Sequence, residues 1–244
     1  RQWLDRYELR GEIHAEGGSA GAEDRPVFRV ELAQFSAQLP EAEGGLRLAN
    51  VRGPLTLSRA GVQIGAEPPE PGADSPRPLV ATLPQAGGAR VQLWGRYDRF
   101  EADSPFTVHV RVEGMSVPAP GTTTGRLAKL LSDLRRRFRP SGGHVDAALT
   151  VRRHAGGDVA YEGHADLHDL TVVYDAYPYR LTGLGGRLEV RPGVLKTAGE
   201  GLLGHHGRGT IRIAGRLPVQ PGAVFDLHLQ ARDVALDPEL KAAL

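Results

Sequence analysis

The chain contains no cysteine, one methionine and few aromatic residues, and each scarcity removes a class of structure or function. Without cysteine there are no disulfides, no thiolate nucleophile and no thiolate metal site. Aromatic residues make up 6% of the chain, so bulky core anchors are scarce and the apolar surface consists mainly of Leu, Val and Ala. No apolar run approaches the roughly 18 residues that span a bilayer, and Arg1-Gln2-Trp3-Leu4 is not a signal peptide.

An excess of charge of one sign is missing as well. The net charge is +1, which gives no general attraction to nucleic acid, so we expect no nucleic-acid partner. Turn-forming residues are abundant. The 32 glycines and 18 prolines indicate many short elements joined by turns. The chain does not begin with Met, and its last residues, 237–244, have the pattern of a helix that has only begun. We expect it to be a segment of a longer protein.

Apolar residues alternate with polar ones in the clearest segments, which is typical of strands with one apolar face. The pattern runs through residues 106–112, 145–151 and 225–231. Short connections between such segments favour antiparallel pairing, because parallel strands need long crossovers and read as continuous apolar runs. The sequence therefore predicts a mainly β, antiparallel fold.

The two halves of the chain also resemble each other. Residues 47–57 align with 180–190 without a gap, residues 91–96 with 211–216, and residues 106–110 with 225–229, in the same order. We interpret this as two tandem repeats, each of about six strands followed by a short helix. The first repeat is residues 1–139, with a proline-rich insertion at 66–78 and a closing helix at about 124–138. The second is residues 140–244, ending in the start of a helix at Asp237.

About a dozen strands with one apolar face each form a surface that must be covered by something. The helices are too few to cover it. Either two sheets pack face to face in a sandwich, or one strongly curved sheet forms an open trough whose apolar interior holds another molecule. Periodicity does not separate the two, although the smooth Leu, Val and Ala lining favours the trough.

Three segments resemble the AsmA-like family, the bacterial relatives of bridge-like lipid-transfer proteins. Residues 177–190, YPYRLTGLGGRLEV, resemble that family's strand pair with a glycine step before an alternating strand. Residues 210–216, TIRIAGR, resemble its recurrent strand ending in Gly, and residues 227–237, LHLQARDVALD, resemble its strand that leads into a capped helix. The resemblance covers most of the second half, from about Ala147 onwards.

The resemblance implies an open β-groove, built from stacked repeats of the same chain, that binds acyl chains and conducts lipid between membranes in outer-membrane homeostasis. It implies phospholipid or another acyl lipid as partner, membranes at the ends of the full-length protein, and a periplasmic or envelope location anchored by a transmembrane helix outside this segment. The groove floor would then include Val108, Val110, Val112, Leu188, Val190, Ile211, Ile213, Phe225, Leu227 and Leu229. The alternative is a structural β-sandwich repeat or adhesion scaffold without a ligand.

No enzymatic site is expected, and no cofactor. His164, Asp166 and His168 alternate along one strand face and form a weak candidate for a metal site, with a metal-dependent hydrolase as the remote alternative. The same three polar residues are also expected without a metal, on the solvent-facing side of an amphipathic strand. Residues 199–204, GEGLLG, match the dinucleotide fingerprint, but a strand and no helix follows, so no helix N-terminus is there to receive a pyrophosphate.

Overall fold

The structure of the chain is a computed structural model, which describes residues 10–18, 27–38, 47–66, 77–99, 104–117, 135–175, 177–218, 224, 226–235, 238 and 241. Within these residues no helix has the length and the apolar character needed to cross a membrane.

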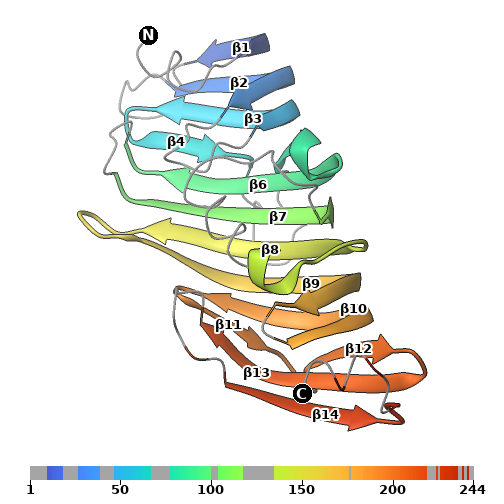
Figure 1. Ribbon diagram of the computed structural model, residues 1–244. Helices are drawn as coiled ribbons and strands as arrows, with labels where there is room; N and C mark the ends of the chain where they lie inside the picture. Colours follow the sequence, from blue (N-terminus) through green and yellow to red (C-terminus); the bar gives the residue numbers. More distant parts are fainter. Residues whose placement is uncertain are drawn as a thin grey trace.

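In the described part of the chain fourteen strands pair into one sheet, which confirms the prediction of a mainly β fold (Figure 1). Every pairing between described strands is antiparallel. The strands of the first half are β1 (Arg10–Gly18), β2 (Val27–Gln38), β3 (Arg47–Ser58), β4 (Gly61–Ile64), β5 (Leu79–Leu83), β6 (Ala89–Tyr97) and β7 (Phe106–Ser116). Those of the second half are β8 (His144–Arg153), β9 (Val159–Tyr174), β10 (Tyr177–Arg191), β11 (Val194–Thr197), β12 (Leu202–His206), β13 (Gly209–Pro218) and β14 (Asp226–Arg232).

The order of pairing in β1–β7 recurs in β8–β14. In the first half β4 and β5 both lie between β3 and β6, and in the second half β11 and β12 both lie between β10 and β13. Each of these pairs of short strands runs end to end in a single row. Each half therefore has seven described strands in six rows. The expected number of about six corresponds to the rows, because one row is split in two.

The proline-rich insertion lies at the break between the two short strands of the split row. Residues 198–201 separate β11 from β12 in the sequence, whereas residues 65–78 separate β4 from β5. An antiparallel bridge joins Ala66 and Arg77, near the two ends of the longer connection, and the Ala66 N–H donates to the Arg77 carbonyl at 2.9 Å. The insertion thus leaves the pairing of the neighbouring strands intact.

β-Bulges occur at equivalent positions in the two halves, in β2 and β3 of the first and in β9 and β10 of the second. Gln34 in β2 and Asp169 in β9 have φ of 52° and 56°, and Asn50 in β3 and Gly183 in β10 have φ of 53° and 61°. The pairing register shifts at each of these sites. Asn, Asp and Gly adopt this left-handed conformation at the lowest cost, which fits three of the four positions. A bulge bends its strand, so each half of the sheet is bent at this pair of neighbouring strands.

Buried apolar side chains form two clusters, one in each half. At four equivalent positions an apolar side chain is buried in both halves. The equivalent pairs are Phe35 and Leu170, Val51 and Leu184, Leu79 and Leu202, and Val91 and Ile211. The core of the second half is thus built on the same rows as that of the first.

The two predicted helices fall largely outside the described residues. Of the helix at about 124–138, residues 135–138 are described and are helical. They lie against the end of β9, where Phe138 stacks on Tyr174 with ring centroids 5.3 Å apart. Of the helix expected from Asp237, Pro238 and Lys241 are described and are helical.

Candidate functional site: the apolar face of the sheet

One face of the sheet is apolar from the first half into the second. Residues directly opposite each other in paired strands lie on the same face, so the register traces rows of side chains across the sheet. One such row passes through β6, β7, β8, β9, β10, β11 and β13 and consists of Leu93, Val110, Leu149, Gly163, Val190, Leu195 and Leu217. At the boundary between the halves Val110 faces Leu149, and Val108 faces Val151. The apolar face continues through the junction without a polar residue in these rows.

The predicted floor residues share this face. Val108, Val110 and Val112 line β7, and the register carries the face to the other described members: Leu188, Val190, Ile211, Ile213, Leu227 and Leu229. Phe225 lies outside the described residues. The alternation along each strand is what made these positions visible in the sequence.

The described strands all belong to one sheet, so no second sheet of described strands packs on this face. The two buried clusters lie on the same face, and the row through Val110 lies beside them. The sandwich alternative needs two sheets packed face to face, and the described strands do not form them. The six apolar side chains of the row through Val110 and Leu149 are all partly exposed. At the edge, Leu229 is 62% exposed. Among the described residues no large side chain is fully buried.

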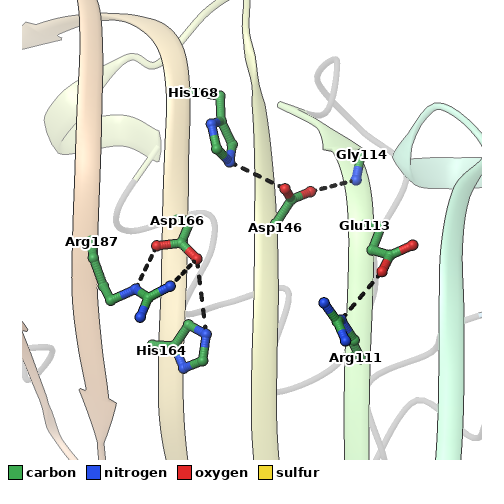
Figure 2. Close-up of polar contacts among 8 residues, drawn as sticks. All are labelled: Arg111, Glu113, Gly114, Asp146, His164, Asp166, His168 and Arg187. Atoms are coloured by element: carbon green, nitrogen blue, oxygen red, sulfur yellow. Dashed lines mark hydrogen bonds and ion pairs between the residues drawn. The ribbon is translucent and has the colours of Figure 1, made fainter. Parts of the chain in front are cut away.

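The opposite face is polar and carries a ladder of charged pairs (Figure 2). Arg187 of β10 donates from Nε and Nη2 to both oxygens of Asp166 on β9, at 2.7 and 2.8 Å. This two-pronged hydrogen bond lowers the pKa of Asp166, with the nearby positive charge adding to the effect against some desolvation. Arg111 and Glu113 of β7 form a further pair at 3.2 Å. The side chains of both pairs are partly exposed to solvent.

The three residues proposed as weak metal ligands are not brought together. His164 Nε2 lies 3.8 Å from Asp166 Oδ2, but that carboxylate is already engaged by Arg187. His168 is directed instead toward Asp146 on β8, with 3.1 Å between Nε2 and Oδ2. Figure 2 shows His168 and His164 on either side of Asp166, each turned to a different carboxylate. Residues along one strand face are separated by about 7 Å, so partners come more readily from neighbouring strands.

One other sequence feature also has a structural explanation. Gly199 and Glu200 form a turn, and the strand β12 follows, so the glycines of residues 199–204 serve a turn between strands. Nearby contacts are structural as well: Arg139, which follows the helical residues 135–138, forms an ion pair with Asp175 just after β9.

Comparison with protein-family models, with curated proteins and with solved structures found no match. The resemblance to the AsmA-like family therefore stays a prediction from the sequence.

Proposed function

We propose that this chain is a segment of an envelope protein whose apolar sheet face binds acyl chains and conducts lipid between membranes. The observation that carries the proposal is the continuity of the apolar face across the junction between the halves, where Val110 faces Leu149. The side chains of this row are partly exposed, so they are accessible to a ligand. A continuous, partly exposed apolar row is the kind of surface that marks a binding site for a partner.

The energetics of lipid movement fit such a face. Transfer of an acyl chain through water costs about 0.8 kcal/mol for each CH₂, so a chain of about 16 carbons faces roughly 12 kcal/mol. A floor of Leu and Val removes most of this barrier. Apolar contact has no preferred direction, so a lipid moves between nearly equivalent rows without a unique binding residue.

The periplasmic location and the membranes at either end of the full-length protein belong to the same proposal. They rest on the resemblance to the AsmA-like family, and the apolar face is compatible with them. A structural scaffold without a ligand is the competing outcome of the experiment that follows.

Adjacent residues of β8 provide a matched test. Leu149 belongs to the apolar face, whereas Ala148 faces Arg111 and His164 on the polar face. Leu149→Glu places a charge on the floor, where it opposes burial of an acyl chain, and Ala148→Glu places the same charge on the wet side. We expect native mass spectrometry of the purified chain to detect bound phospholipid in the wild type and in Ala148→Glu, and at least about tenfold less in Leu149→Glu.

Circular dichroism and thermal unfolding of both variants check that the fold is kept, and Leu149→Ser repeats the test with a smaller polar group. A wild-type chain that is folded, free of lipid and indifferent to phospholipid vesicles would favour the scaffold. Equal lipid content in Leu149→Glu and Ala148→Glu would place the bound lipid elsewhere.

A further inference from the structure

We propose that His144, Asp146 and His168 form a binding site for a divalent transition metal such as Zn²⁺ or Ni²⁺. The site lies on the polar face, opposite the proposed lipid face. The metal proposal does not depend on the lipid proposal, and the outcome of the test of one does not affect the other.

Strand pairing brings the three side chains together. His144 on β8 and His168 on β9 are directly opposite each other in the register. Asp146 lies two residues along β8, on the same face. One ligand atom from each of the three residues lies within 4.8 Å of the others. Along the strand itself, the spacing of His164, Asp166 and His168 does not achieve this.

The distances are close to those of a metal site. With metal–ligand bonds of about 2.0–2.2 Å, two ligands of a tetrahedral ion lie about 3.4 Å apart. Nε2 of His168 already lies 3.1 Å from Oδ2 of Asp146. The rings of His144 and His168 are stacked, with centroids 4.6 Å apart. A nitrogen lone pair lies in the plane of its ring, so binding requires a side-chain rotation that breaks this stack, and we expect an affinity in the micromolar range.

The carboxylate is positioned by a separate contact. Oδ1 of Asp146 accepts a hydrogen bond of 2.7 Å from the N–H of Gly114, a residue with φ of 68° at the bulge in β7 (Figure 2). This contact fixes the carboxylate and leaves Oδ2 directed toward His168, as outer-shell hydrogen bonds do at metal sites. It also places the site beside the junction of the two halves, because Gly114 is in the first half and the three ligands are in the second.

The nitrogen of His168 is available as a ligand. Nε2 is buried and, in spite of its proximity to Asp146, lacks the alignment of a hydrogen bond. A buried polar atom without a hydrogen bond is destabilising, and a bound cation would satisfy it together with the carboxylate. Two imidazoles and one carboxylate suit Zn²⁺, Ni²⁺ and Cu²⁺ and do not suit Mg²⁺ or Ca²⁺.

Calorimetric titration of the chain with zinc chloride and nickel chloride at about pH 8 tests the site, since metal ligands must be deprotonated. We expect one ion per chain and no heat from magnesium chloride. His144→Ala and His168→Ala should each weaken zinc binding by about 100-fold or more, since even the loss of an outer-shell partner costs about 10- to 100-fold. His164→Ala, on the same face of the same strand, is the matched control and should bind as the wild type does.

Asp146→Asn separates the metal from the fold, because the amide oxygen still accepts the Gly114 N–H while the anionic ligand is lost. We expect Asp146→Asn to unfold at the wild-type temperature without metal and to bind zinc more weakly. Zinc should raise the unfolding temperature of the wild type and leave that of His168→Ala unchanged. No zinc or nickel binding by the wild type, or zinc binding that is the same in His144→Ala and His168→Ala, would overturn the proposal.

Discussion

Asp166 and Asp146 lie opposite each other on β9 and β8, yet each carboxylate has its partners on other residues. Arg187 of β10 takes both oxygens of Asp166, and Gly114 of β7 and His168 of β9 contact Asp146. Alternation along residues 164–168 predicts that three side chains share a face. It does not predict which residues of the next strands face them, because the register of strands distant in sequence is set by long-range pairing. The trio suggested by the sequence therefore shares only His168 with the group that strand pairing brings together.

The Asp166–Arg187 pair gives stability a defined dependence on pH. The pKa of Asp166 is lowered in the folded chain, so the unfolded chain binds a proton at a higher pH than the folded chain does. The stabilisation is complete above the ordinary pKa of the carboxyl and is lost as the pH falls through the lowered folded pKa. We expect Asp166→Asn to remove this part of the acid destabilisation, seen as a shallower fall in the free energy of unfolding between about pH 5 and pH 3.

Arg187→Gln serves as the partner control, because it removes the cause of the lowered pKa and leaves the carboxyl in place. Urea unfolding at a series of pH values measures both variants. A profile of Arg187→Gln that matches the wild type would show that the pair does not carry the effect.

At the scale of the strand, the alternating pattern contains a step that marks each bulge. In β9 the apolar face is carried by Ala165 and Leu167 and then by Leu170 and Val172, with one extra residue between the two pairs. The extra residue keeps the apolar face on one side while the strand bends. Alternation alone predicted strands but not the bulges within them. β2 has the same step, because its apolar face passes from Leu32 to Phe35, with Gln34 at the position equivalent to Asp169.

The bulge in β3 makes a testable distinction. Asn50 has φ of 53° and its equivalent in β10 is Gly183, so the position needs a residue that tolerates the left-handed conformation. We expect Asn50→Gly to change the free energy of unfolding by less than about 0.5 kcal/mol and Asn50→Val to lower it by about 1–2 kcal/mol. Urea unfolding measures both. Ala49→Val, at the adjacent strand residue, is the control, and a cost there equal to that of Asn50→Val would mean that side-chain bulk and not backbone conformation is responsible.

At the scale of the molecule, the sequence predicted the antiparallel sheet and the correspondence of its segments, because period and order are local properties. It did not establish that the halves form one sheet. That depends on β7 and β8, which pair through residues 106–116 and 144–153 although the closing helix was expected between them. It also left the trough and the sandwich unresolved, since both place the same residues on an apolar face.

β14 is an edge strand of the sheet, whereas the equivalent strand of the first half, β7, is paired on both sides. β14 corresponds to β7, and in the described residues it pairs with β13 alone, whereas β7 pairs with both β6 and β8. Leu229, 62% exposed on the apolar face of β14, corresponds to Val110. An exposed apolar edge favours strand addition, and a lysine on the edge opposes it. We expect sedimentation velocity to show concentration-dependent self-association of the chain that is reduced by Leu229→Lys.

Leu203→Lys is the control, because Leu203 is 41% exposed on the polar face of β12, which is paired on both sides. A similar reduction by Leu203→Lys would point to charge in general and not to the edge. A wild-type chain that is monomeric at all concentrations would contradict the prediction.

The six rows in each half determine how far one half extends the sheet in the direction across its strands. Neighbouring strands in a sheet lie about 4.8 Å apart, so six rows advance the sheet by about 29 Å. That is close to the thickness of the hydrocarbon core of a bilayer, about 30 Å. Each added repeat would lengthen an acyl-chain path by about one membrane thickness, so in the proposed function the number of repeats in the full-length protein sets the distance that it bridges.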